Sequence, residues 1–171
     1  ADNIQLEAAK SPIRIIDLFL HTAGFSYGFT NSAVDKLYKA LPPLSKADSL
    51  DTVLKRIATL PLNHQPGTQC HYGINTDIIG LLVERISGMK LGEYMQEVIF
   101  TPLEMTDTAF YVPSNKVDRL AQIYSPGKNG EISVLDPPPV GDFLSDPSVH
   151  NGGGGLVSTI GDYYIFTQML L

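Results

Sequence analysis

The sequence has a single cysteine and few charged residues, and both shortages narrow the classes of protein to which it can belong. Cys70 is the only cysteine among 171 residues, which excludes a framework of disulfide bonds within the chain. Charged residues make up 18% of the chain and hydrophobic residues 43%, a balance that argues against disorder. No apolar run approaches the ~20 residues that a membrane-spanning helix requires. The first twelve residues lack the apolar core of a signal peptide, and nothing here identifies a cellular compartment.

Basic residues are also fewer than acidic ones, 12 against 18, which gives a formal net charge of −6. Binding to a phosphate backbone relies on an excess of Lys and Arg, so nucleic acid is not expected to be a partner. Glycine and proline are abundant by contrast, since 15 glycines and 12 prolines make about 16% of the chain against a usual ~12%. That composition predicts many turns and short elements, and the length fits one domain or a large part of one.

Apolar residues at helical spacing predict helices through most of the first hundred residues. The first helix is expected to follow Pro12 and to end at Gly24, because glycine favours helix termination. The others are expected over residues 32–41, 50–59, 76–87 and 91–99. Polar residues that precede three of them are expected to act as N-caps, namely Asn31, Asp48 or Ser49, and Asn75 or Thr76.

Shorter elements are predicted in the second part of the chain. Residues 108–112 predict a strand, and residues 120–124 and 131–135 predict the two arms of a hairpin around a Pro-Gly turn. A long Pro/Gly-rich loop over residues 136–155 leads to a last helix that begins at Ser158 or Thr159. We therefore expect a mainly α chain with a small β portion, in the α+β class.

Residues 1–171 are expected to form a single partial domain. Its parts are a helical region over residues 1–106, a region of strands, hairpin and glycine-rich loop over residues 107–157, and a helix over residues 158–171. The last helix is still apolar at Leu171 and carries no stop signal. We therefore expect that helix to be cut short and the chain to be a piece of a longer protein.

Tyr72 is the residue that first suggests chemistry. It follows a rigid Pro66-Gly67 turn and precedes the predicted start of a helix, whose positive end favours the phenolate form of a nearby tyrosine. A tyrosine so placed can act as a general base. The alternative is that the ring only packs against the helix, as many half-buried tyrosines do.

Five stretches of the chain, in order, resemble the serine β-lactamase-like superfamily, which comprises class C β-lactamases, D-alanyl-D-alanine carboxypeptidases and related carboxylesterases. The stretches are residues 15–24, 60–72, 78–88, 100–108 and 152–159. The resemblance implies the helical region of the β-lactamase/transpeptidase-like fold. It also implies a serine nucleophile in a Ser-x-x-Lys motif, an acyl-enzyme intermediate, and a proton-transfer role for Tyr72.

The nucleophile itself is not evident in this chain. The two local Ser-x-x-Lys matches, residues 87–90 and 125–128, lie at a predicted helix C-terminus and in a Pro-Gly turn, and neither suits an activated serine. The resemblance places the nucleophile before Ala1 and a third active-site motif after Leu171, so flanking segments of the same protein are expected to complete the site. A non-catalytic fragment or pseudo-enzyme is therefore one alternative function.

The branch of the superfamily is indicated by the residues after Tyr72. β-Lactamases and carboxypeptidases carry an asparagine two residues after this tyrosine, whereas here Asn75 comes three residues after it. This departure favours a carboxylesterase-like hydrolase, expected to be bacterial, that acts on a small-molecule ester or amide. A β-lactamase or a D-alanyl-D-alanine carboxypeptidase is the other enzymatic alternative.

Several other residues are candidates for substrate binding. Phe25, Tyr27 and Phe29 either line an acyl pocket or pack the loop that carries them, and the sequence favours neither reading. His150 and Gly153 are expected to lie at the edge of the substrate cleft. Together with the catalytic candidate Tyr72, these residues make up the predicted site.

No metal or cofactor is expected. His64, Cys70 and His71 lie close together in the sequence, but their spacing matches no standard zinc pattern. The glycine run over residues 152–155 lacks the Lys-Ser/Thr pair that completes a phosphate-binding loop. His21 is expected to be a hydrogen-bonded structural histidine.

Overall fold

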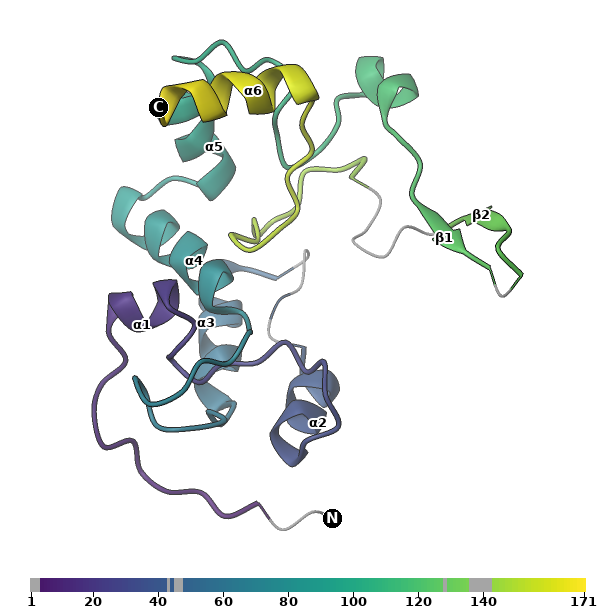
Figure 1. Cartoon of the computed structure of the whole chain (residues 1–171). Coiled ribbons are helices and arrows are strands. Elements are labelled where there is room, and N and C mark those ends of the chain that lie inside the picture. The colour runs from purple at the N-terminus through teal and green to yellow at the C-terminus, as the bar shows by residue number, and fades with distance from the viewer. Residues whose placement is uncertain (1–3, 43, 45–47, 128, 136–142) are drawn as a thin grey trace. The chain divides into compact units, whose positions relative to one another are not determined.

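The computed structural model describes residues 4–42, 44, 48–127, 129–135 and 143–171 (Figure 1). The chain divides into two compact units. The first consists of Ala1–Tyr94 and Ser148–Gly154, and the second of Met95–Pro147 and Gly155–Leu171. The described residues are mostly helical with one two-stranded sheet, so the predicted class, mainly α with a small β portion, is confirmed.

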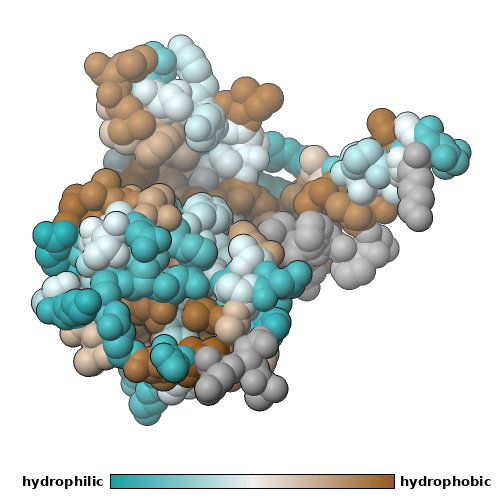
Figure 2. All heavy atoms as spheres, turned by 60° about the horizontal axis from the view of Figure 1, so that its bottom comes forward, coloured by the Kyte–Doolittle hydropathy of each residue, from teal (hydrophilic) through white to brown (hydrophobic). Residues whose placement is uncertain are grey.

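Helices build the first unit. They are α1 (Ile15–Phe19), α2 (Ala33–Ala40), α3 (Leu50–Thr59), α4 (Asn75–Ser87) and α5 (Leu91–Met95), the last of which ends one residue beyond the unit. Apolar residues of these helices and of the loops between them meet in one core, which includes Leu18, Phe25, Tyr38, Val53, Ile57, Ile74 and Leu81. Other apolar side chains stay at the surface beside polar ones, as Figure 2 shows for one face of this unit.

Local signals at the helix ends account for most of these bounds. The Ser32 and Ser49 hydroxyls accept hydrogen bonds from backbone N–H groups of α2 and α3 and cap those helices. Gly88 ends α4 in the left-handed conformation, with φ at 72°. The helix predicted over residues 50–59 is confirmed residue for residue, whereas the cap predicted at Asn31 is one residue too early.

The second unit holds shorter elements. They are η1 (Gln96–Phe100), η2 (Ser114–Arg119), β1 (Tyr124–Pro126), β2 (Ile132–Val134) and α6 (Ile160–Met169). The two strands pair antiparallel, with Tyr124 opposite Val134, which confirms the predicted hairpin although its first arm begins later than expected. Thr159 caps α6, as predicted.

The predicted first helix was too long. Helix α1 ends at Phe19 and not at Gly24, because His21 adopts the left-handed conformation with φ at 54°. The Thr22 N–H then donates to the carbonyl of Asp17 at 2.7 Å, which closes the turn five residues after it began. A left-handed histidine at this point was not foreseen, since glycine and asparagine are the usual residues there.

Two further predictions were wrong in detail. The helix expected over residues 91–99 divides into α5 and the π-helical η1, where the Thr101 N–H donates to the Gln96 carbonyl at 2.8 Å. Residues 108–112 do not form a strand with any of the described residues, among which Ala109 pairs with Val157 in an isolated bridge. The hydroxyl of Thr108 donates instead to Asp162 in α6, so the segment is tied to a helix. Of the predicted loop over residues 136–155, residues 136–142 lie outside the described part.

Asp17 fixes the turn that follows α1. Its buried carboxylate accepts hydrogen bonds from the Arg14 guanidinium at 2.8 and 3.1 Å, from the Arg14 backbone N–H at 2.9 Å, and from the Thr22 hydroxyl at 3.3 Å. The hydrogen bonds from Arg14 lower the pKa of Asp17 to about 2. Asp17 thus links the end of α1 to the start of the chain segment that carries the candidate site.

Acid is therefore expected to weaken the first unit through Asp17. Because the pKa of Asp17 is lower in the folded chain than in the unfolded one, its contribution is complete above pH ~4 and disappears as the pH falls towards 2. Urea unfolding at pH 7 should show a lower midpoint for Asp17→Asn than for the unmodified protein. Below pH ~2, the folded-state pKa of Asp17, the two midpoints should converge. Asp51→Asn, in an exposed ion pair with Arg85, is the control and should leave the midpoint unchanged.

Among the described residues, none of the helices is both long enough and apolar enough to cross a bilayer.

Candidate active site

Tyr72 lies on the loop between α3 and α4, with its ring exposed and its backbone held on both sides. The side chain is 62% exposed. The N–H of His71 donates to the carbonyl of His21 at 2.8 Å, before the tyrosine. After it, Gly73 packs so closely on the neighbouring segment that a Cβ there would lie 2.2 Å from the Phe25 carbonyl oxygen. The loop therefore presents the phenol of Tyr72 from a fixed backbone.

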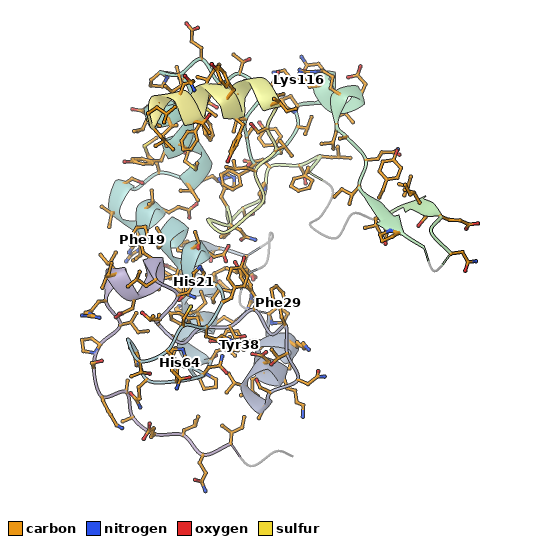
Figure 3. All side chains as sticks on the ribbon, viewed as in Figure 1. Phe19, His21, Phe29, Tyr38, His64 and Lys116 are labelled. Atoms are coloured by element: carbon orange, nitrogen blue, oxygen red, sulfur yellow. The ribbon has the colours of Figure 1, made fainter. Side chains whose placement is uncertain are left out.

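Three rings surround that phenol and form with it an aromatic cluster of His21, Tyr27, Phe29 and Tyr72. The ring centroid of Tyr72 lies 5.1 Å from that of His21, 5.4 Å from Tyr27 and 6.4 Å from Phe29. Tyr27 and Phe29 stack on each other at 5.1 Å. Phe29 is 74% exposed, so the cluster has an apolar surface beside the Tyr72 phenol. Figure 3 labels His21 and Phe29, which lie near each other in the first unit.

Tyr27 is held by a buried carboxylate at the start of α4. Its hydroxyl donates to Asp77 Oδ2 at 2.5 Å, and the backbone N–H of Gly153 donates to Asp77 Oδ1 at 2.9 Å. Burial, with the hydrogen bond to Asp77 and the charge on it, raises the pKa of Tyr27 well above its usual value. Tyr27 therefore stays a neutral hydrogen-bond donor.

A second buried carboxylate fixes the loop that carries Tyr27 and Phe29. Asp35 in α2 accepts hydrogen bonds from the Ser26 hydroxyl and from the backbone N–H and hydroxyl of Thr30. Burial opposes its ionisation, but the hydrogen bonds from Ser26 and Thr30 outweigh burial and lower the pKa of Asp35. The loop over residues 25–30 is thus anchored from within the first unit.

The sequence predicted Asn75 or Thr76 as the N-cap of α4, but neither residue caps the helix. Ile74 occupies the N-cap position, and Asn75 is the first residue of the helix. Its buried side chain donates from Nδ2 to Nδ1 of His21 at 2.9 Å. The cap prediction failed because the amide is engaged by a side chain 54 residues away in the sequence, which no local pattern reveals.

The structure brings together some of the predicted site residues and not others. Tyr72 contacts Tyr27, and Gly153 lies against Tyr27 and Asp77, where an added Cβ would come within 3.0 Å of both side chains. Phe25 lies in the hydrophobic core, and the Nδ1 of buried His150 accepts the N–H of Gly92 at 2.8 Å. The substrate-binding roles of these residues stay predictions.

Sequence reasoning missed Asp77 altogether. An acidic residue in the first turn of a helix is a common favourable feature, so its position carried no special signal. Its partners Tyr27 and Gly153 are 50 and 76 residues away in the sequence. Only the fold shows that one carboxylate joins two of the predicted site residues.

The serines of the two local Ser-x-x-Lys matches lie at a helix C-terminus and in a strand. Ser87 is the last residue of α4, and its hydroxyl accepts the N–H of Met89. Ser125 lies in β1, and Lys128 lies outside the described residues. Within the described residues, no group of three or more His, Cys, Asp or Glu side chains is arranged to hold a metal ion.

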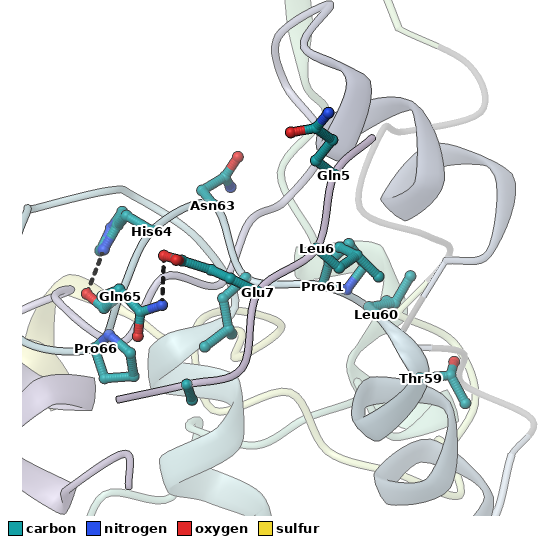
Figure 4. Close-up of a pocket in the computed structure, with 12 residues that line it drawn as sticks. Gln5, Leu6, Glu7, Thr59, Leu60, Pro61, Asn63, His64, Gln65 and Pro66 are labelled. Carbon is teal, nitrogen blue, oxygen red and sulfur yellow. Dashed lines mark hydrogen bonds between the residues drawn. The ribbon is translucent and has the colours of Figure 1, made fainter. Parts of the chain in front are cut away.

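A pocket of about 540 Å³ in the first unit lies apart from this constellation (Figure 4). It is formed by the N-terminal segment and the loop after α3. Its lining residues are Gln5, Leu6, Glu7, Ala9, Thr59, Leu60, Pro61, Leu62, Asn63, His64, Gln65 and Pro66. The Gln65 amide bonds to Glu7 at 2.7 Å and ties the two segments together. Since no residue of the aromatic cluster lines this pocket, it is not the candidate active site.

Comparison with known proteins assigns the family. A protein-family model described as β-lactamase matches residues 4–171. The chain belongs to the β-lactamase family. The family-model match covers both units, and thus the aromatic cluster together with Asp77 and Gly153.

Three curated relatives of this β-lactamase-family chain are informative. Protein Rv1367c of Mycobacterium tuberculosis is 39% identical over 166 residues, which are 95% of this chain and 40% of the relative. Monacolin J acid methylbutanoyltransferase of Aspergillus terreus is 32% identical over 174 residues, 100% of this chain and 41% of the relative. Lovastatin esterase of Penicillium rubens is 34% identical over 146 residues, which are 84% of this chain and 32% of the relative. The family to which this chain is related thus includes hydrolases and acyltransferases.

A solved structure also supports the β-lactamase-like fold for this chain. A mutant of simvastatin synthase (LovD) from Aspergillus terreus superposes with a TM-score of 0.78 at 28% identity, over 97% of this chain and 38% of that one. The described helices and sheet therefore match part of the β-lactamase-like fold, as the sequence had predicted. The chain spans about two fifths of the length of most of these relatives.

Proposed function

We propose that the whole protein is an acyl hydrolase that works through an acyl-serine intermediate, with Tyr72 as its proton-transfer residue. One observation carries the proposal. Tyr72 presents an exposed phenol from a backbone held on both sides, inside an aromatic cluster in which Tyr27 bonds to the buried carboxylate of Asp77. Groups that transfer protons are effective when such restraints hold them close to their reactive geometry.

The reaction balances with one serine, one tyrosine and one water. The Tyr72 phenolate takes the proton of the serine hydroxyl while the serine oxygen bonds to the substrate carbonyl carbon. As the tetrahedral intermediate collapses, the bond to the leaving group breaks and the Tyr72 hydroxyl returns the proton to that group. A water molecule then attacks the acyl-serine by the same proton route, which releases the acid and restores the serine.

The surroundings of Asn75 favour an ester as the substrate. In the β-lactamase and carboxypeptidase pattern, an asparagine near the tyrosine contacts the substrate amide. Here the Asn75 side chain is buried and bonded to His21, so it is not available for such a contact. The name of one relative, lovastatin esterase, agrees with this branch.

Acyl transfer to an alcohol is the second candidate function. A relative named as a methylbutanoyltransferase is 32% identical across the whole chain. The chemistry differs only in the second step, where an alcohol replaces water as the acceptor of the acyl group. The exposed face of Phe29 offers apolar surface on which such an acceptor can pack.

We also propose that these 171 residues are one part of the catalytic domain. The chain spans 40% of Rv1367c, and neither of its Ser-x-x-Lys matches suits a nucleophile. The serine and its lysine then belong to flanking segments of the same protein, which lie beyond these residues.

Labelling with a fluorophosphonate tests the proposal. The whole protein should acquire one label at a serine outside these 171 residues, while the 171-residue chain alone should remain unlabelled when analysed by mass spectrometry. The whole protein should also cleave p-nitrophenyl butyrate with a higher kcat/KM than the β-lactam nitrocefin.

Each other outcome would change the assignment. A label on a serine within these residues would contradict the proposed position of the nucleophile. A whole protein that takes no label and cleaves no ester would contradict the enzymatic function and favour the non-catalytic alternative. A preference for nitrocefin would favour the β-lactamase alternative over the esterase.

A further inference from the structure

His21 touches the Tyr72 loop in three places. Its carbonyl accepts the N–H of His71 at 2.8 Å, immediately before the tyrosine. Its ring lies 5.1 Å from the Tyr72 ring, the shortest of the three ring contacts that Tyr72 makes in the aromatic cluster. Its Nδ1 accepts the Nδ2 hydrogen of Asn75 at 2.9 Å, three residues after the tyrosine. One residue therefore contacts the chain on both sides of Tyr72, through its backbone carbonyl before the tyrosine and through its ring after it.

We propose that His21 is a positioning residue that holds the Tyr72 phenol in its reactive orientation, and that Asn75 in turn holds the His21 ring. This inference rests on the proposed function, since it concerns the work of Tyr72. It extends that function because it gives His21 and Asn75 a role in catalysis, in which Asn75 acts neither as a helix cap nor as a substrate contact.

The need for such a restraint follows from the exposure of Tyr72. With 62% of the side chain exposed, the core does not select its χ1 rotamer, so neighbouring rings must do so. Phe29 is more exposed still, at 74%, and lies farther away at 6.4 Å. Tyr27 faces Tyr72 at 49°, while its hydroxyl is fixed on Asp77. His21 is the nearest of these neighbours, and its own ring is anchored by a buried partner.

The backbone conformation of His21 also supports a positioning role. A non-glycine residue with φ at 54° is strained, and such strain persists where the surrounding contacts impose it. The strained geometry is what directs the carbonyl towards His71 while the ring turns towards Tyr72 and Asn75. A histidine that served only to end α1 would need neither ring contact.

Asn75 is suited to hold the ring because it can serve either tautomer. As the amide is placed, Nδ2 donates to His21 Nδ1, which puts the ring proton on Nε2. Among the residues that the structure describes, the buried Oδ1 of Asn75 has no hydrogen-bond partner. If the amide turned by 180°, Oδ1 would accept from a protonated Nδ1 instead. The ring is therefore restrained in both states.

The main test is His21→Asn in the whole protein. Asparagine tolerates the left-handed conformation, and its Oδ1 takes roughly the place of Nδ1, so the bond to Asn75 is kept while the ring contact with Tyr72 is lost. With p-nitrophenyl butyrate, kcat should fall about 10- to 100-fold, the range in which a slightly misplaced catalytic group costs rate. KM should stay within about twofold, and the end point of fluorophosphonate labelling, which counts competent sites, should be unchanged.

His71→Asn is the matched control. It makes the same substitution next to Tyr72, and the His71 ring faces His64 at 6.4 Å and is not part of the aromatic cluster. Its kcat should stay within about twofold of the unmodified value. A drop equal to that of His21→Asn would show a general loss in the loop and would overturn the positioning role.

Asn75→Ala tests the same restraint without altering the strained backbone of His21. Alone it should lower kcat about fivefold or more, because the His21 ring is then free to turn. In the His21→Asn background it should have almost no further effect, since the ring that Asn75 orients is already gone. An equal effect in both backgrounds would contradict the chain of contacts from Asn75 through His21 to Tyr72.

The results separate this inference from the function on which it rests. If kcat of His21→Asn is unchanged in a protein that needs Tyr72, only the positioning role is wrong. If the kcat of His21→Asn and its labelling end point fall by the same factor, fewer sites are competent. His21 is then only structural, and the inference is wrong. If Tyr72→Phe itself is fully active, the proposed function is wrong.

Discussion

Replacing Tyr72 by phenylalanine in the whole protein is expected to lower kcat for an activated ester about 10²- to 10⁴-fold, the usual contribution of a general acid–base group. The substitution removes one hydroxyl from a side chain that is 62% exposed, so the aromatic contacts with His21 and Tyr27 are kept. The melting temperature of the Tyr72→Phe protein should therefore match that of the unmodified protein. Steady-state hydrolysis of p-nitrophenyl butyrate measures the effect, and KM should change little, because a proton-transfer group acts in the transition state.

The control for Tyr72→Phe is Tyr124→Phe in β1. Tyr124 is also exposed, and within the described part of the chain its hydroxyl donates to Gln122 at a long distance of 3.4 Å. The same chemical change there should leave kcat within about twofold. A Tyr72→Phe protein that retains more than a tenth of the rate would contradict proton transfer by this phenol. The fluorophosphonate label would then still show whether a serine nucleophile operates without it.

The parts of the fold that the sequence predicted are those that local signals determine. Helix α3 is the clearest case, because Ser49 caps it and its apolar residues recur at helical spacing over the whole of Leu50–Thr59. The position of Tyr72 on an irregular loop before α4 follows from the prolines and glycine that precede it. These features require no knowledge of what packs against them.

Contacts between distant parts of the chain were not predictable in the same way. The Tyr27–Asp77 bond joins residues 50 apart, and the His21–Asn75 bond joins residues 54 apart. In each case the residue in the first turn of α4 had a plausible local explanation, either as a favourable acidic residue or as an N-cap, and that explanation concealed its tertiary partner. The predicted strand over residues 108–112 failed for a related reason, since alternation in one segment forms a strand only where a neighbour pairs along its length.

The largest effect on stability is expected at Gly73, the residue that follows Tyr72. An added Cβ would lie 2.2 Å from the Phe25 oxygen, 2.6 Å from the Phe25 carbonyl carbon and 2.7 Å from the Ser26 Cα. All three are backbone atoms, so no side-chain rotation can relieve the clash, and two chain segments must separate. Gly73→Ala should therefore lose about 3 kcal/mol of unfolding free energy, at the upper end of what overpacking in a core costs.

Gly154→Ala provides the matched control for this clash. It adds the same methyl group at a glycine where no atom of the described residues lies within 4 Å of the added Cβ, so the free energy of unfolding should change by less than about 0.5 kcal/mol. Urea titrations of both variants, followed by circular dichroism, measure the difference. Because the 25–30 segment also carries Tyr27 and Phe29, Gly73→Ala should lower esterase activity even in the fraction that remains folded. Equal urea midpoints for the two variants would contradict the close approach of Gly73 to Phe25, and with it the fixed backbone on which the role of Tyr72 depends.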